Sequence, residues 1–424
     1  MSDTAAAAGP RKAAVAFIFV TMMLDTLAFG LIIPGFPHLI AGFVDNDVAR
    51  ATLWHGMFMT AFMLMQFVFS PVQGALSDHF GRRPIILLSN LGLGLDFILM
   101  AVINTLPLLF IGRILSGITS ASFSTANAYI ADVTPPEKRA QAFGLMGVAF
   151  GVGFVIAPAL GGVLSDWHPR LPFVFAAALS LMNFCYGLFV LPESLPKDRR
   201  APFQWRRANP VGSLLLLRRY PQVLGLVMVL FLMQLAHIVY PSTFVLYADY
   251  RFGWGAKMVG YTLAIVGVLS AIVQGGLIKK IIAMEGERRT LLLGLLCGTA
   301  GFVLYGLAPT GYWFWAAMPI AAFWGISQPA AQAIMTRQVD PHEQGRLQGA
   351  VTSLASLAGI FGPTLFTRVL AWESHSEVTL WSGATFFLAA SLLGLAFVIA
   401  YFKTRHLPPM AQAVAPATEP AGAG

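Results

Sequence analysis

The sequence is poor in charge and in cysteine. Only 11% of its 424 residues are charged, and 57% are hydrophobic, whereas a soluble domain carries roughly 25% charged residues. The two cysteines, Cys185 and Cys297, lie in separate apolar stretches, which argues against a disulfide framework and against a cysteine-based metal site. No Gly-Lys phosphate-binding motif for ATP occurs. We therefore expect a membrane protein that is not an enzyme, holds no cofactor or metal, and draws energy from an ion gradient.

Long hydrophobic runs take the place of the missing charge. A helix needs about 20 apolar residues to cross a bilayer, and such helices tolerate Gly and Pro. The sequence predicts an all-α membrane protein with about twelve spans, the first of which is retained rather than cleaved as a signal peptide. The predicted spans are 13–40, 52–74, 85–105, 107–130, 141–163, 171–191, 221–247, 258–280, 290–308, 312–336, 347–370 and 380–402.

The basic residues are distributed unevenly between the predicted loops. If both termini are cytoplasmic, most of the 27 Lys and Arg residues fall on the cytoplasmic side, as the positive-inside rule requires. The net charge of +8 then reflects loops that face an anionic leaflet rather than a nucleic-acid partner. We expect a monomeric, multi-pass protein of the bacterial inner membrane, in contact with membrane lipids.

The chain divides into two related halves. A polar linker at 193–220 separates a bundle at 1–192 from a bundle at 221–403, and the Pro/Ala/Gly-rich tail at 404–424 is expected to be disordered and cytoplasmic. "SGIT" at 116–119 and Asp132 match "WGIS" at 324–327 and Asp340 at one offset of about half the chain. Two six-helix bundles with a site between them suit alternating access.

One short loop between the second and third spans concentrates charge. In "GALSDHFGRRP", Gly74 and Gly81 allow tight turns, and Asp78 can accept hydrogen bonds from Arg82 or Arg83. A positive anchor would explain the arginines alone, but it would not explain the acid and both glycines. We interpret the loop as the latch of a cytoplasmic gate.

The loop resembles the signature loop of the major facilitator superfamily. In the fifth span, Gly153, Pro158, Gly161 and Gly162 resemble the antiporter motif of that superfamily, although Ala157 stands where glycine is common; ordinary helix packing is the alternative. Stretches such as "LDTLAFGLIIPGFPHLI" and "RQVDPHEQGRLQG" resemble the tetracycline/proton antiporters over nearly the whole chain. The resemblance implies the major facilitator fold and export of an amphipathic drug, or of its complex with a divalent cation, in exchange for a proton.

Two acids interrupt apolar spans. Asp25 lies in the first span and Asp96 in the third, and a carboxylate in hydrocarbon needs a cavity or a partner. We expect both to handle protons and substrate, with Arg113 as a partner for Asp25; a silent, permanent ion pair with Arg113 is the alternative. His237 is the titratable candidate in the second half, against the simpler role of a hydrogen-bonded core residue.

Amide side chains within the spans are candidates for the wall of a substrate cavity, although such groups also bond to neighbouring helices. They are Gln66, Asn127, Gln234, Gln328 and Gln332. Where the resemblance implies an acid and a histidine in the second half, Gly298 and Ser270 stand instead, and Ala283 replaces the counterpart of Asp78. These departures weaken tetracycline as the substrate more than they weaken antiport. A metabolite transporter of the same superfamily and a transporter-like sensor that moves nothing are the alternatives.

Overall fold

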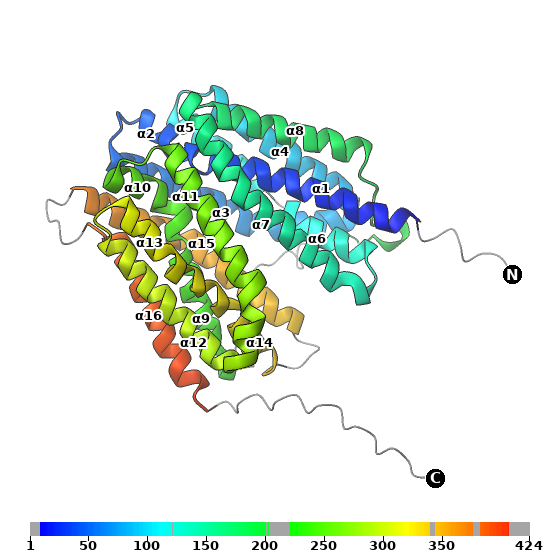
Figure 1. Ribbon diagram of the computed structural model, residues 1–424. Helices are drawn as coiled ribbons and strands as arrows, with labels where there is room; N and C mark the ends of the chain where they lie inside the picture. The colour runs from blue at the N-terminus through cyan, green and yellow to red at the C-terminus, as the bar shows by residue number, and fades with distance from the viewer. Residues whose placement is uncertain are drawn as a thin grey trace, which may run out of the picture.

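The computed structural model describes residues 9–120, 122–200, 202, 221–339, 344–375 and 382–406. Within these ranges the chain is helical and has no strand (Figure 1), which confirms the predicted all-α class. By length and composition, nine helices of the described part can cross a membrane. That number is compatible with twelve spans, because the stretch 256–307 reverses at Gly286 and two other predicted spans are each broken into shorter helices.

The first half of the chain forms eight helices and one short 3₁₀ turn in the described residues. They are α1 (Gly9–Ile32), α2 (Gly35–Gly42), α3 (Val48–Phe80), α4 (Arg82–Val102), α5 (Leu106–Thr119), α6 (Ser122–Val133), α7 (Pro136–Trp167), α8 (Leu171–Phe189) and η1 (Lys197–Arg199). The predicted first span is divided between α1 and α2, which meet at Pro34, and the predicted fourth span is divided between α5 and α6 near Ser120. Proline supplies no backbone N–H, so it interrupts the helical ladder at the first of these breaks.

The helices of the second half are interrupted more often than those of the first half. Its elements are α9 (Pro221–His237), the π-helix η4 (Tyr240–Phe244), α10 (Val245–Phe252), α11 (Ala256–Ala271), the π-helix η5 (Ile272–Leu277), α12 (Ile278–Leu307), α13 (Gly311–Ala322), the 3₁₀-helix η6 (Phe323–Ile326), α14 (Ser327–Thr336), α15 (Gln344–His375) and α16 (Ala384–Thr404). Gly286, at φ 74°, separates two spans that both belong to α12. Most of the predicted linker, the tail beyond His406, and Asp340 lie outside the described residues.

The two halves touch mainly along two pairs of helices, α7 with α11 and α3 with α15. Glycines permit the closest of these approaches: a Cβ on Gly162 of α7 would lie 2.5 Å from the carbonyl oxygen of Ala256, and one on Gly260 of α11 would collide with the carbonyl oxygen of Pro158. These contacts lie in the second half of α7 and the first half of α11, toward the end of the molecule that is distant from the start of α1 and the end of α16. Backbone therefore meets backbone at that end.

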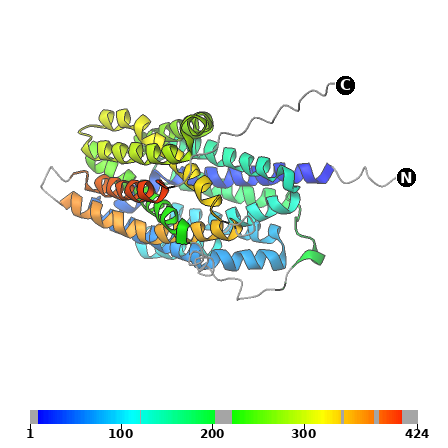
Figure 2. The same cartoon turned by 90° about the horizontal axis from the view of Figure 1, so that it is seen from below.

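At the other end the halves separate. We call the side at which α1 begins and α16 ends the terminal face, and the other side the opposite face (Figures 1 and 2). Toward the terminal face, a Cβ on Gly144, Gly147 or Gly151 of α7, or on Gly275 or Gly276 of η5, would meet nothing within 4 Å. The ribbons of the two halves diverge in the same direction (Figure 1). The structure is thus closed at the opposite face and open toward the terminal face.

Candidate transport site

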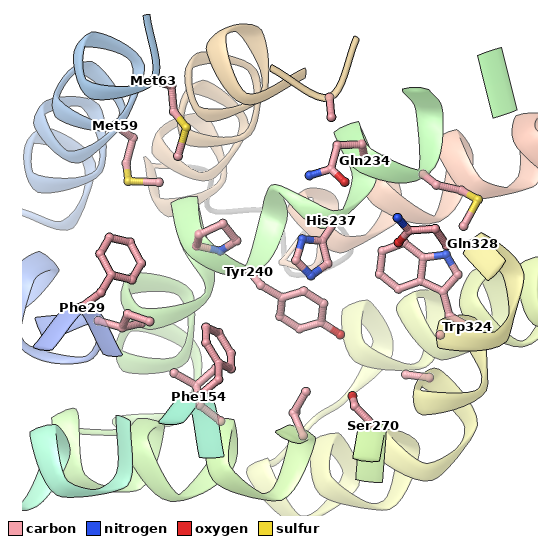
Figure 3. Close-up of a pocket in the computed structure, with 18 of the residues that line it drawn as sticks. Phe29, Met59, Met63, Phe154, Gln234, His237, Tyr240, Ser270, Trp324 and Gln328 are labelled. Carbon is pink, nitrogen blue, oxygen red and sulfur yellow. The ribbon is translucent and has the colours of Figure 1, made fainter. Parts of the chain in front are cut away.

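A cavity of about 500 Å³ lies between the two halves (Figure 3). Its first-half wall is formed mainly by phenylalanine, isoleucine and methionine side chains, to which His55 of α3 and Arg113 of α5 add polar groups. Its second-half wall carries polar groups: Gln234, His237, Ser270, Gln274 and Gln328. An apolar pocket with a few convergent polar groups is the usual form of a site for a small organic ligand.

Part of this second-half wall lies at the interruption after α9. Helix α9 ends at His237 and the chain resumes as a π-helix at Tyr240. The ring of His237 lies 5.9 Å from that of Tyr240 and 5.7 Å from that of Trp324, measured between centroids, and all three residues line the cavity (Figure 3). Since π-helical turns are frequent at functional sites, this break places a titratable ring on the cavity wall. A proton-carrying role for His237 stays a prediction.

A hydrogen bond between the halves closes the cavity toward the opposite face. His55 of α3 is only 3% exposed, and its Nε2 lies 3.1 Å from the carbonyl oxygen of Pro241 in η4. A carbonyl can only accept, so Nε2 carries the proton and Nδ1 is the free acceptor of the ring. His55 was not among the residues predicted from the sequence, although it is a single histidine in the apolar second span.

Other polar contacts join the halves on the same face. Thr60 of α3 contacts Thr364 of α15, with 3.0 Å between the hydroxyl oxygens. Lys257 of α11 lies 3.5 Å from Asp166 of α7. Because these contacts connect the two halves, they must break if the opposite face opens.

Asp25 lies in a cage of amides inside the first half. Its carboxylate is 2% exposed and does not line the cavity. Asn183 of α8 donates to Asp25 Oδ1 over 2.8 Å. Asn90 of α4, with its amide nitrogen turned toward the carboxylate, donates to both Asp25 oxygens over 3.1 and 3.2 Å. Two amides, one from α8 and one from α4, therefore face this single buried carboxylate.

Asp96 and Arg113 form a buried ion pair between α4 and α5. Arg113, and not Asp96, reaches the cavity wall, and its guanidinium carbon lies 5.3 Å from the ring centre of Phe36 and 5.6 Å from that of Phe62. The partner of Arg113 is therefore Asp96, and the predicted pairing with Asp25 is wrong. The reason is geometric: α4 and α5 are adjacent antiparallel helices, so the two side chains meet at the same depth.

The charged loop forms a compact cluster at the terminal face, within the first half. Arg82 Nη1 lies 2.6 Å from Asp78 Oδ1, and Arg82 Nε lies 3.1 Å from Asp132 Oδ2 at the end of α6. Gly74, in contrast, faces open space. The described contacts of Asp78 and Arg82 do not cross to the second half in this conformation, so the gating role of the cluster stays a prediction.

Glu193, which was not predicted from the sequence, binds the start of α4. Its carboxylate accepts the backbone N–H groups of Arg82 and Arg83, over 2.9 and 3.3 Å, which satisfies donors that a helix start leaves unpaired. Gly81 adopts φ 109°, and a Cβ there would collide with the same carboxylate. Arg83 donates to the carbonyl oxygen of Gly187 at the end of α8. Gly81 is thus required both by its φ and by the approach of Glu193.

The glycines of the predicted antiporter motif are contact points of α7. A Cβ on Gly153 would lie 2.7 Å from the methyl group of Thr26, and one on Gly161 would collide with the carbonyl oxygen of Leu31, both in α1. Gly162 faces α11, and Pro158 lies inside α7. Helix α7 therefore packs closely against both halves. This geometry fits the packing interpretation and the antiporter interpretation equally.

Two of the five amide candidates, Gln234 and Gln328, line the cavity (Figure 3). Gln66 and Gln332 are not among the lining residues, and Gln66 instead donates to the carbonyl oxygen of Ser120 over 3.2 Å. Asn127 is exposed on α6 and is also outside the cavity lining. The sequence identified these amides as intramembrane, but only the packing of the helices decides which of them face the cavity.

The sequence profile of the Major Facilitator Superfamily matches residues 18–363 and 286–421. The tetracycline resistance protein, class C, of Escherichia coli is 38% identical over 379 residues, covering 89% of this chain and 94% of the relative. The class H protein of Pasteurella multocida is 34% identical, covering 94% and 98% of the two chains. Among solved structures, a bacterial homologue of the human lysosomal transporter Spinster, in an inward-facing and occupied conformation, has a TM-score of 0.73 at 16% identity, covering 93% and 97%. This chain belongs to the Major Facilitator Superfamily.

Proposed function

We propose that this protein exports tetracycline-like amphipathic drugs across the bacterial inner membrane in exchange for protons, by alternating access. The observation that carries the proposal is the cavity between two halves that touch at one face and part at the other. The names of the relatives, which are tetracycline resistance proteins, support the drug class. The excess of basic residues in the loops of the terminal face supports a cytoplasmic location for that face, so the structure corresponds to the state that loads substrate from the cytoplasm.

Asp25 is the proton carrier in this proposal. As a carboxylate it accepts from the amide nitrogen of Asn90, and as a carboxylic acid it donates to the amide oxygen of Asn90 once that amide has turned. Both protonation states therefore have a complete hydrogen-bonding arrangement. Phe29, one helical turn from Asp25 on α1, lies on the cavity wall, so protonation at Asp25 is coupled to the cavity through α1 itself.

Asp96 and Arg113 have a different role. The guanidinium of Arg113 is paired with the carboxylate of Asp96, and both are buried. We assign Arg113 to the orientation of substrate at the cavity wall and Asp96 to holding Arg113 in place. A divalent cation carried with the drug also remains part of the proposal, as cargo of the cavity and not as a resident metal.

Everted membrane vesicles test the proposal. Tetracycline uptake that requires an imposed pH gradient, that a proton uncoupler abolishes and that Asp25→Asn eliminates is the expected result. Asp96→Asn should lower substrate affinity and leave proton dependence intact. A metabolite transporter would move sugars or amino acids but not tetracycline, and a sensor would show no flux in any variant; either outcome would overturn the proposal.

A further inference from the structure

A second hollow lies on the flank of the molecule, outside the cavity. It is a groove of about 680 Å³ formed by Thr60 of α3, Leu235 of α9, and the face of α15 from Ile360 to Trp372. It follows the line along which α3 of the first half meets α15 of the second. The proposed transport cycle makes no use of this groove.

The groove has the dimensions and the surface for a hydrocarbon chain. Phe361 and Leu365, one helical turn apart on α15, are exposed along it. The segment from Phe361 to Trp372 extends about 16 Å at the rise of an α-helix, which is about half the thickness of a bilayer core. An apolar groove of this length, on a surface that faces lipid, fits one acyl chain of one leaflet.

Among the described residues that form the groove, Arg368 is the one cation, and it lies toward the opposite face. Arg368 is exposed on the same face of α15, and none of the described acidic side chains lies within ion-pair distance of it. It is about 10 Å from the end of α15 at His375. Trp372, one turn closer to that end, is 55% exposed, and exposed tryptophans anchor helices at the headgroup level. A long guanidinium stem can reach the same level, so Arg368 presents its charge where lipid phosphates lie.

The floor of the groove is part of the contact between the halves. Thr60 donates to or accepts from Thr364 over 3.0 Å, and its hydroxyl also lies 3.3 Å from the carbonyl oxygen of Ile360. A molecule that fills the groove covers these bonds. It also touches both halves only while they are in contact at the opposite face.

We propose that this groove binds an anionic phospholipid, with its phosphate on Arg368 and one acyl chain along Leu365 and Phe361. Charge complementarity selects the headgroup, since a zwitterionic lipid gains less from a lone cation at the interface. The bound lipid stabilises the conformation that is closed at the opposite face. This site is separate from the drug cavity and does not depend on which substrate is transported.

Quenching of Trp372 fluorescence measures occupancy directly. The full-length protein is reconstituted in phosphatidylcholine vesicles that contain increasing fractions of brominated phosphatidylglycerol, and the contribution of Trp372 is the difference from Trp372→Phe. We expect quenching at a several-fold lower fraction of brominated phosphatidylglycerol than of brominated phosphatidylcholine. Arg368→Gln should raise the half-quenching fraction about fivefold, and Arg368→Lys should retain most of the preference.

Arg50→Gln is the matched control, because Arg50 is an exposed arginine near the same face on α3. It should leave the quenching curve unchanged. Native mass spectrometry of the same variants gives a second readout, the number of phosphatidylglycerol molecules retained, which does not require Trp372. Equal quenching by both lipids, or an Arg368→Gln curve that matches the unmodified protein, overturns the proposal. Because both measurements report binding, they are independent of drug transport.

Discussion

Replacing Asn183 by alanine should move the proton equilibrium of Asp25 by a predictable amount. The substitution removes the amide that donates to Asp25 Oδ1 over 2.8 Å in a site that is 2% exposed. A hydrogen bond to a charged group contributes about 1.5–3 kcal/mol, and about 1.4 kcal/mol corresponds to one pH unit. The carboxylate loses this stabilisation and the neutral acid loses less. The pH midpoint for proton release should therefore rise by about 1 to 2 units.

Infrared difference spectroscopy reports this midpoint through the carbonyl stretch of the protonated acid. The band that disappears in Asp25→Asn identifies the group, and its titration in Asn183→Ala gives the midpoint. The pH profile of tetracycline uptake should move in the same direction. If proton release is the limiting step, transport at neutral pH falls about tenfold or more, because the acid no longer empties at cytoplasmic pH.

Ser180→Ala is the matched control for this experiment. Ser180 lies one helical turn from Asn183 on α8 and is equally buried, and its hydroxyl has no hydrogen-bond partner in the described residues. Its removal should leave the midpoint of Asp25 unchanged. An Asn183→Ala protein that folds, but whose midpoint stays within about 0.3 units of the original, would refute the assignment of Asp25 as an amide-stabilised proton carrier.

Three further predictions concern the contacts between helices. Gly161→Val forces side-chain atoms into the backbone of α1 and should destabilise the protein by about 1–3 kcal/mol in a thermal or denaturant assay, whereas Gly144→Ala, which faces open space, should not. Gly147→Leu places bulk on a surface that must close at the terminal face, so drug binding should persist while turnover stops; undiminished turnover would contradict alternating access. His55→Phe removes the bond to Pro241, which contributes about 1 kcal/mol, so label-to-label distances across the opposite face should show about fivefold more of the open population. No change in that population would show that the bond does not hold the gate.

The sequence predicted the class of the protein well, because the bilayer imposes length and hydropathy directly on each span. The predicted spans 85–105 and 171–191 correspond closely to α4 and α8. The interruptions within the helices were harder to predict from the sequence. The stretch "IVYPSTF" contains a proline, but only the folded chain shows that the helix continues there as a π-helix and that His237 and Tyr240 face the cavity.

The charged loop illustrates a second limit. The acid, the arginines and the glycines of "GALSDHFGRRP" were identified from their spacing alone, and they form a cluster as expected. Glu193 was not identified, because it is about 110 residues away in sequence and approaches Gly81 only through the packing of α4 against α8. Local spacing carries no information about such a contact.

By itself, the sequence determined that this protein spans a membrane with helices, which residues are polar inside it, and which face of it is basic, since each of these follows from local composition. The tertiary structure decided which of these polar side chains contact one another. It placed Asp25 among amides and Asp96 against Arg113, and it put Gln234 and Gln328, but not Gln66, on the cavity wall. Which side chains meet depends on how each helix is rotated about its axis and how deep it lies when it packs against a helix distant in sequence. Small residues allow the close approach that sets this packing. No single helix specifies it.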